Sequence, residues 1–331
     1  MPEAATPSRW PRSAAAALLI GLLGAMAWMP AAAGPGASEA PVLELSDLKE
    51  SSGGPMSLRS GPLEVQVRVN QLKANGPHET DVVQPELRVL LDGQPVGRMV
   101  GAEHWGHPTG LVQIAQMDPA SPLPEVLLSS FTGGAHCCNQ IQVLRPTASG
   151  GAWQEVSLGP FNGGPAPASD PLGDGRWRIV DVDNRFLYRF GCYACSGAPL
   201  RIWQLQGDRF RDVSHEPAYR PLHQQHLLQM EDQLEEAGDM PNGVLAAYVA
   251  TTALVGDLQA GWDRMLRSHD PDEDWGLSDC PQPLDQQGRC PVPEIRYGSY
   301  PEALRAFLVA SGYISASEAA GLSLQRPGPS S

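Results

Sequence analysis

Apolar residues recur with two different periods along this chain, and the change of period divides it into two parts. Between residues 63 and 216 the pattern is typical of strands. Residues 63–69 (LEVQVRV) alternate apolar and polar side chains, as a half-buried strand does. Residues 87–100 hold an Asp-Gly pair between two apolar runs, which predicts a hairpin. From about residue 221 the apolar period is about 3.6, which predicts helices.

The second part, residues 221–331, is expected to form a small helical region. Helices are predicted over residues 223–238, 243–256, 257–269 and 300–314. Gly238 is expected to end the first of these, and Asn242 to cap the second. Because amphipathic helices must bury their apolar faces, we expect this region to pack onto the β-rich part. The side chains expected at that contact are Leu227, Leu245, Tyr248, Val249, Trp262, Leu266, Leu304 and Phe307.

The β-rich part, residues 63–216, contains an internal repeat whose copies span residues 111–158 and 177–214. The first strand of each copy leads to an aspartate, Asp118 or Asp183, and these lie 65 positions apart. Each copy is expected to hold four strands, with a pair of cysteines directly after the second strand. Neighbouring copies would then bring the two cysteine pairs side by side.

A first strand that ends in Asp, followed by a second that opens with PEVLLSSF (124–131), resembles the blades of FG-GAP and VCBS-type β-propeller repeats over residues 111–214. The resemblance implies blade-like four-stranded antiparallel units. In those families the aspartate begins a calcium-binding loop, but the loops after Asp118 and Asp183 lack the carboxylates that calcium needs. Two or three blades cannot close a propeller, so a sandwich is an equal alternative. The predicted class is α+β, with a β-rich N-terminal part and a helical C-terminal part.

The start of the chain has the features of an export signal. Residues 1–33 combine a short basic segment, an apolar run over 14–28 and small residues before a cleavage site near Ala33. The apolar run is shorter than the roughly 20 residues that a bilayer helix requires. Residues 34–62, rich in Pro, Gly and Ser, are expected to form a flexible leader. The mature protein should therefore be periplasmic or secreted, with no membrane span.

The charge of the chain excludes one class of partner. The sequence holds 37 Asp and Glu against 23 Lys and Arg, a formal net charge of −14. Residues 231–274 alone hold eleven acidic residues and two arginines. An acidic surface disfavours attraction to nucleic acid or anionic lipid. An unknown protein or small-molecule ligand is the expected partner, and no cofactor is expected.

The six cysteines lie in the predicted mature chain, and an even number in an exported protein indicates disulfides. Cys280 and Cys290 should close a local loop over residues 280–290. The others are the adjacent Cys137 and Cys138, and the CYAC pair Cys192 and Cys195. We expect disulfides between these two pairs, because each pair ends the same strand of its copy. The alternative joins Cys192 to Cys195 and leaves Cys137 and Cys138 joined to each other or free.

Candidate chemistry centres on the sequence GGAHCC (133–138). A thiolate beside His136 could act as a nucleophile, and His136 with Cys137, Cys138, Cys192 and Cys195 could hold zinc. CYAC could also be a redox motif, although it follows a predicted strand rather than opening a helix. Disulfide pairing is favoured over each of these.

Other groups of metal-ligand residue types are expected to be solvated surface. They are the His104–His107 and His223–His226 pairs and the acidic residues Asp270, Asp272, Glu273 and Asp274. The sequence thus predicts an exported, non-catalytic binding or envelope-associated protein. The alternatives are a hydrolase or redox enzyme that uses His136, Cys137 and Cys138, and a periplasmic metal-binding protein.

Overall fold

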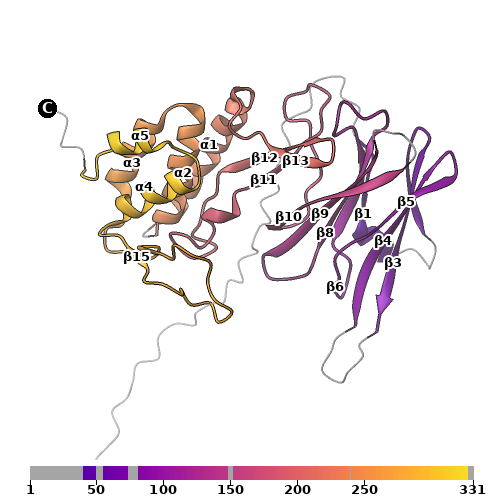
Figure 1. Ribbon diagram of the computed structural model, residues 1–331, viewed down its shortest axis with the longest axis horizontal. Coiled ribbons are helices and arrows are strands. Elements are labelled where there is room, and N and C mark those ends of the chain that lie inside the picture. Colours follow the sequence, from indigo (N-terminus) through magenta and orange to yellow (C-terminus); the bar gives the residue numbers. More distant parts are fainter. Residues whose placement is uncertain (1–39, 50–54, 74–80, 148–151, 239, 327–331) are drawn as a thin grey trace, which may run out of the picture. The chain divides into compact units, whose positions relative to one another are not determined.

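The computed structural model of the chain describes residues 40–49, 55–73, 81–147, 152–238 and 240–326 (Figure 1). The predicted signal peptide and the first residues of the predicted leader lie outside these ranges. The described chain has an α+β architecture, with antiparallel sheets in its N-terminal part and helices in its C-terminal part. That division agrees with the change of apolar period near residue 221.

The central element of the β-rich part is a five-stranded antiparallel sheet. Its order is β1 (Val42–Glu44), β7 (Gly110–Ala115), β8 (Glu125–Phe131), β9 (Cys137–Pro146) and β10 (Trp153–Asn162). Every residue of β7 is buried, and all but the last of β8. A strand buried on both sides indicates a sheet that is covered on both faces.

A second sheet covers one of these faces. It consists of β2 (Met56–Ser60), β3 (Leu63–Leu72), β4 (Val82–Leu91) and β5 (Gln94–Val100), with β6 (His104–Trp105) paired to β4. The alternation predicted for residues 63–69 is confirmed, since Leu63, Val65 and Val67 are buried. The predicted hairpin is confirmed too. Its Asp92 and Gly93 have φ of 48° and 77°, as both central residues of a type I′ turn require.

The two sheets share one apolar core and form a sandwich. Val65 and Val89 of the second sheet and Val112 and Val126 of the central sheet belong to this core. Leu45, in the 3-10 helix η1 (Leu45–Lys49), is also fully buried there. The expectation of a flexible leader over residues 34–62 is therefore wrong where the structure describes them. Leu43 and Leu45 supply apolar side chains that fill the sandwich, and β1 pairs with β7.

A three-stranded sheet lies against the other face of the central sheet. It consists of β11 (Ile179–Val182), β12 (Leu200–Gln206) and β13 (Arg209–Asp212). Its Ile179 and Leu205 share a core with Leu127 and Val143. No closed barrel or propeller forms among the described strands.

The second copy of the predicted repeat has three strands instead of four, which corrects the sequence analysis. The segment expected to form its second strand is the 3-10 helix η2 (Asn184–Phe186) followed by a turn. Asp183 caps η2 by accepting a hydrogen bond from the backbone N–H of Arg185. Phe186 and Phe190 are buried among the helices, so this segment serves the helical core rather than the sheet.

The helical part is built around α2, which is buried along nearly its whole length. It packs against α1, α3, α4 and η2, and a helix apolar on all sides requires such cover. The helices are α1 (Arg220–Glu236), α2 (Asn242–Val255), α3 (Leu258–Ser268), α4 (Tyr300–Ala310) and α5 (Ala316–Gly321). Shorter elements are η3 (Pro217–Tyr219), β14 (Ser278–Asp279) and β15 (Ile295–Arg296).

The predicted contact between the two parts is confirmed. The eight helical side chains predicted to form this contact, from Leu227 to Phe307, pack in one core with Phe186, Phe190 and Ala198. One boundary differs, because Asn242 is the first helical residue of α2 and does not cap it. Its side chain instead bonds the backbone of Asp270. Among the described residues, no helix is both long enough and apolar enough to cross a bilayer.

Candidate functional site

The segment that begins β9 and the CYAC segment of residues 192–195 lie side by side. The ring of His136 stacks on Tyr193, with 4.2 Å between ring centroids and 23° between ring planes. The Tyr188 hydroxyl lies 3.0 Å from Nε2 of His136. The candidates in HCC and in CYAC are thus brought together, as the repeat predicts. We call the group His136, Cys137, Cys138, Tyr188, Cys192, Tyr193, Cys195 and Trp275 the aromatic–disulfide cluster.

The cysteines form short-range disulfides. Cys137 is joined to Cys138, Cys192 to Cys195 and Cys280 to Cys290. The expected disulfides between HCC and CYAC are therefore wrong, although the two segments are neighbours. Stacked rings occupy the contact between the segments. A turn meanwhile brings the Cα atoms of Cys192 and Cys195 to 4.9 Å, a normal bonding separation. The local loop over residues 280–290 is closed in the way that its sequence favours.

His136 is held at both ring nitrogens. Nδ1 lies 3.0 Å from Oδ1 of Asn162, at the end of β10, so Nδ1 donates to this oxygen. Nε2 then accepts from the Tyr188 hydroxyl. Since Cys137 and Cys138 are joined to each other, His136 has no thiol beside it to activate. The arrangement orients rings rather than a nucleophile.

Two aromatic side chains of the cluster are open to solvent. Tyr188 is 47% exposed and Trp275 is 45% exposed. Nε1 of Trp275 donates to the backbone carbonyl of Tyr188 at 2.8 Å, and the Tyr188 backbone N–H donates to Oγ of Ser196. Tyr188 has φ of 61°, a left-handed conformation that large residues rarely adopt. Fixed hydrogen bonds thus hold both rings at the surface.

An ionisable group borders the cluster. Burial raises the pKa of Asp181, in β11, to about 7. Burial also raises the pKa of Tyr193, and the nearby Tyr188 and Asp181 raise it further. Asp181 therefore exchanges a proton near neutral pH, and its carboxylate charge acts on a ring that contacts His136.

The CYAC segment packs closely on the start of α2. A Cβ added to Gly243 would lie 2.3 Å from the carbonyl oxygen of Cys195, so only glycine fits there. The Gly197 N–H also donates to the carbonyl of Gly243. Sγ of Cys195 lies 3.8 Å from Sδ of Met240, which is 57% exposed. The helical part therefore supports one side of the cluster.

The remaining candidates named from the sequence do not join the cluster. His223 is buried rather than solvated, which corrects the expectation, and Nε2 lies 2.8 Å from the Ser214 carbonyl. His226 binds the Ala198 carbonyl, so both residues fasten α1 to the sheet beneath it. His107 is exposed. The acidic residues 270–274 form a loop after α3. Among the residues that the structure describes, no three His, Cys, Asp or Glu side chains are grouped to hold a metal ion.

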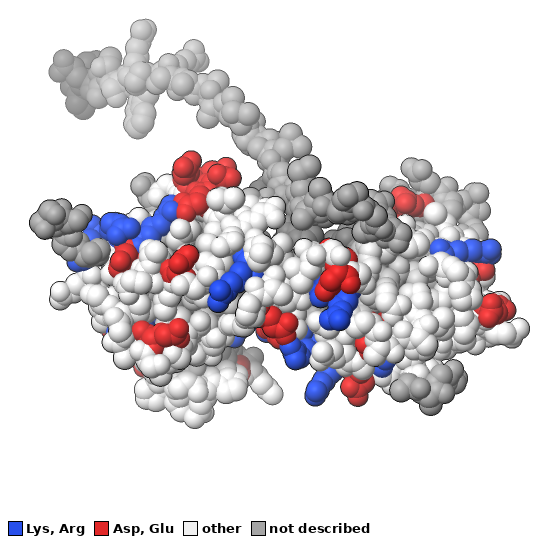
Figure 2. All heavy atoms as spheres, turned by 90° about the horizontal axis from the view of Figure 1, so that it is seen from above, with Lys and Arg blue, Asp and Glu red and all other residues white. Residues whose placement is uncertain are grey.

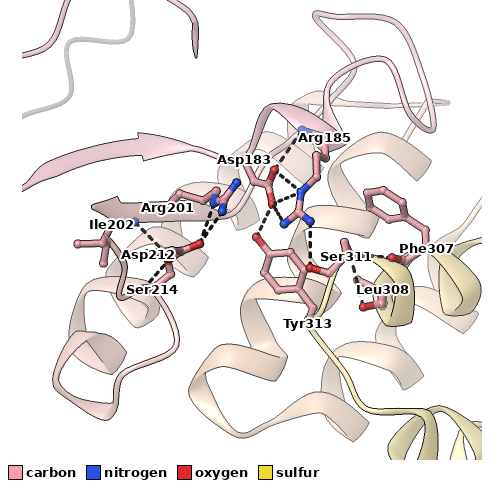
Figure 3. Close-up of polar contacts among 10 residues, drawn as sticks. All are labelled: Asp183, Arg185, Arg201, Ile202, Asp212, Ser214, Phe307, Leu308, Ser311 and Tyr313. Atoms are coloured by element: carbon pink, nitrogen blue, oxygen red, sulfur yellow. Dashed lines mark hydrogen bonds and ion pairs between the residues drawn. The ribbon is translucent and has the colours of Figure 1, made fainter. Parts of the chain in front are cut away.

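The buried Asp183 and its neighbour Arg185 contact the helical part through Tyr313 and Ser311 (Figure 3). Asp183 is fully buried, and its carboxylate accepts hydrogen bonds from Nε and a terminal nitrogen of Arg185. The hydroxyl of Tyr313, between α4 and α5, donates to the same carboxylate at 2.9 Å. Burial would raise the pKa of Asp183, but the Arg185 contacts outweigh it and lower the pKa. Arg185 also donates to the Ser311 carbonyl, which completes a structural contact.

The surface carries charges of both signs. In the face that Figure 2 shows, Lys and Arg side chains are interspersed with Asp and Glu. That face has no extended basic area of the kind that binds nucleic acid.

The aromatic members of the cluster and their partners are not predicted by the sequence pattern. Tyr193 lies within the CYAC motif, where only the cysteines drew attention. Tyr188 and Trp275 have no local signal, because what matters is the contact between segments 87 residues apart. The histidine in HCC and the tyrosine in CYAC could have been linked only through the expected neighbouring position of the two segments.

Comparison with known proteins places the chain in a family. A probable thylakoid lumen protein of Synechocystis, sll0997, is 46% identical over 235 residues, which cover 70% of this chain and 68% of that protein. The chain belongs to the sll0997 family. The model of the sll0997 C-terminal domain matches residues 223–312, from α1 to the end of α4. This match includes Trp275 and the loop over residues 280–290, whereas the other cluster residues precede it.

A second member of the comparison is longer. The uncharacterized protein y4bJ of Sinorhizobium fredii is 32% identical over 265 residues, which cover 79% of this chain and 41% of that protein. No solved structure matches the chain. The resemblance to FG-GAP and VCBS-type blades stays a prediction, since the matched family model is a different one and covers the helices.

Proposed function

We propose that this member of the sll0997 family is an exported, non-catalytic binding protein of the cell envelope, whose partner contacts the aromatic–disulfide cluster. The observation that carries the proposal is the pair of half-exposed rings, Tyr188 and Trp275, with the Trp275 indole fixed by a hydrogen bond to the Tyr188 backbone carbonyl. Aromatic side chains are enriched where proteins bind partners, and rigid ones lose little entropy on binding. Two disulfides close the segments next to these rings.

Three observations support export. Disulfides form and persist in oxidising compartments, and each of the six cysteines is in one. Residues 1–33 have the sequence features of a signal peptide. The Synechocystis relative is named a probable thylakoid lumen protein, a compartment that lies across a membrane from the site of synthesis.

The alternatives named from the sequence have less support. A nucleophilic cysteine needs a free thiolate, and a zinc site needs several. A redox CxxC motif is expected to open a helix, whereas residues 192–195 form a turn. In this structure no cysteine is free.

Binding can be tested with the oxidised mature chain, residues 34–331, immobilised as bait in an envelope extract. Tyr188→Ala and Trp275→Ala should each reduce the capture of a specific component at least fivefold. Leu228→Ala is the matched control, because Leu228 is 68% exposed on α1, outside the cluster. Equal capture by the cluster variants and the wild type would contradict the proposed binding site.

Export can be tested independently by the intact mass of protein isolated from the envelope fraction. We expect a chain that starts near Gly34 and contains no titratable thiol. A mass that retains residues 1–33, or an alkylatable Cys137, would overturn the proposal and favour a thiol-based activity.

A further inference from the structure

The strand that begins with Cys137 ends at a separate pocket. β9 runs from Cys137 to Pro146, so Arg145 lies roughly 26 Å from the aromatic–disulfide cluster at about 3.3 Å per residue. The pocket has a volume of about 480 Å³. It lies between the loop after β7, the end of β9 and the turn that joins β12 to β13. Its size falls within the range of small-molecule sites, about 300–1,000 Å³.

Arg145 is a buried cation with too few partners. The residue is only 7% exposed and lines the pocket. The one hydrogen bond of its guanidinium in the described structure runs from a terminal nitrogen to Oδ2 of Asp118 over 3.4 Å. Nε is buried with no acceptor. A guanidinium has five N–H donors, and leaving them unpaired in the interior costs free energy.

The Asp118 carboxylate does not pair fully with Arg145, because backbone N–H groups also donate to it. Its Oδ1 accepts from the backbone N–H of Ala120, and its Oδ2 accepts from that of Gly207 at 2.9 Å. Glu125 gives no further help, since its carboxylate binds the backbone N–H groups of Met117 and Asp118 and it does not line the pocket.

A second buried arginine is paired more fully through its terminal nitrogens, although its Nε is likewise buried without an acceptor. Arg178 is 2% exposed, and both of its terminal nitrogens bond the Asp174 carboxylate at 2.8 Å. One of them also donates to the Arg176 carbonyl at 2.7 Å. The loose pairing of Arg145 is therefore not general to buried arginines of this protein, and it occurs where the side chain borders a pocket.

The rest of the lining complements a negatively charged group with an apolar body. Arg176 is exposed at the pocket, and its guanidinium makes no hydrogen bond or ion pair in the described part of the chain. Gln204, 8% exposed, also lines the pocket with a side-chain amide that has no described hydrogen bond. Three prolines, Pro119, Pro122 and Pro146, form apolar wall.

We propose that this pocket binds a small organic anion, whose carboxylate or phosphate contacts Arg145 and Arg176 and whose apolar body packs on the prolines. The planar guanidinium fork matches both types of oxyanion in a bidentate manner. Two arginines against one aspartate leave one positive charge for the ligand to neutralise. The site goes beyond the proposed function, because it lies apart from the aromatic–disulfide cluster and takes a different class of ligand.

Calorimetric titration of the oxidised mature chain tests the proposal with four probes: benzoate, phenyl phosphate, inorganic phosphate and benzyl alcohol. Benzoate or phenyl phosphate should bind saturably, and the tighter of the two identifies the preferred oxyanion. Benzyl alcohol, which keeps the ring and lacks the charge, should bind at least tenfold more weakly. Inorganic phosphate should also bind more weakly, because it has no apolar body. Equal binding of benzyl alcohol, or no binding of either aromatic anion, would overturn the proposal.

Variants locate the binding. Arg176→Gln should weaken the preferred probe about tenfold, the loss that one charge-assisted contact gives. Arg145→Lys keeps the charge but loses the fork, and should weaken binding further if the variant retains its cooperative unfolding transition. Arg209→Gln is the matched control, since Arg209 is exposed on the neighbouring β13 and does not line the pocket. An unchanged affinity in Arg176→Gln, or an equal loss in Arg209→Gln, would contradict the assignment.

Discussion

Asp118 and Asp183 occupy matching positions in the two copies of the predicted repeat, each shortly after the first strand, yet their surroundings differ. Asp183 is held at 2.5 to 3.0 Å by the side chain of Arg185 and at 2.9 Å by Tyr313. Asp118 has an arginine at 3.4 Å and two backbone donors. Asp183 closes a contact between two parts of the fold (Figure 3), whereas Asp118 borders an open pocket.

The difference lies in what the distant chain supplies. Tyr313, which follows Asp183 by 130 residues, donates its hydroxyl to Asp183, and its ring packs in the core of the helical part. Near Asp118, the turn that follows β12 supplies only the backbone N–H of Gly207 and leaves Arg145 without further acceptors. At matching positions of the predicted repeat, an aspartate is therefore a structural contact in one copy and borders the proposed anion site in the other.

The largest effect should follow from Asp183→Ala. The substitution removes the charge-assisted hydrogen bonds of Arg185, whose side chain is 44% exposed, at a cost of about 2 kcal/mol, and the stranded Tyr313 hydroxyl adds about 1 kcal/mol. We therefore expect the free energy of unfolding, measured with denaturant, to fall by about 3 kcal/mol. Asp208→Ala, in the exposed turn after β12, is the control and should change it little. A loss below 1 kcal/mol would mean that Asp183 does not hold the two parts together.

The two regions should also differ in the sign of their pH dependence. Burial raises the pKa of Glu125, beside Asp118, from 4.5 to about 7. The folded state binds the Glu125 proton more tightly than the unfolded state does. The resulting contribution to the free energy of unfolding is fully present below pH 4.5 and is lost as pH rises through 7. The shift corresponds to about 3 kcal/mol. The lowered pKa of Asp183 acts in the opposite direction, and its contribution is lost as pH falls below 3.8.

Unfolding at pH 5 and pH 8 measures the Glu125 contribution. Asp181, with a pKa of about 7, adds a slope of the same sign, so Glu125→Gln should remove only part of the wild-type slope. Glu103→Gln, at an exposed position, should leave the slope unchanged. Identical slopes in wild type and Glu125→Gln would show that Glu125 is ionised in the folded protein at both pH values.

Tyr313→Phe should cost about 1.5 kcal/mol, because it deletes one hydrogen bond to a charged carboxylate and leaves the ring in place. Tyr193→Phe is a matched control, since no hydrogen bond of its hydroxyl occurs in the described part of the chain. The two losses, read from the same denaturant titration, should differ clearly. Equal losses would mean that the hydrogen bond from Tyr313 to Asp183 adds no stability and that Arg185 alone stabilises the carboxylate.

Asp118→Asn tests the other aspartate of the comparison. The amide oxygen can still accept from one backbone donor, but the buried Arg145 loses its carboxylate partner, so the loss should be about 2 kcal/mol. Binding of benzoate should tighten about threefold, because the charge that competes for Arg145 is removed. Weaker benzoate binding with unchanged stability would mean that Asp118 itself contacts the anion. Asp208→Asn serves as the control for both measurements.

Local pattern predicted much of this fold. The Asp92-Gly93 turn, the alternating strand at residues 63–69 and the helices follow from short-range rules. The segment after Asp183 does not, because its apolar residues Phe186 and Phe190 fit a strand as well as a turn. Only the helices that cover these rings decide between the two. The short strand β1 has no local signal for the same reason, since its three residues gain stability by pairing with β7.

The proximity of the HCC and CYAC segments was predictable from the sequence, but the disulfide pairing was not. The predicted repeat placed HCC and CYAC next to each other, and His136 does stack on Tyr193. The pairing within each motif depends on turn geometry and ring packing, which spacing does not reveal. Arg145 looked like the end of an ordinary strand. Its unpaired Nε is a property of the folded interior alone.

The contact between Asp183 and Tyr313 has a consequence for how the chain is assembled. A polypeptide that emerges from the ribosome or from a translocation pore with its N-terminus first exposes both sheets of the sandwich, residues 42–162, well before Tyr313 appears. The sandwich can close on its own contacts, whereas Phe186 and Phe190 must wait for the last helices. The incomplete chain therefore exposes aggregation-prone aromatic side chains until about 130 further residues have emerged. A chaperone or a pause in delivery would act within that interval.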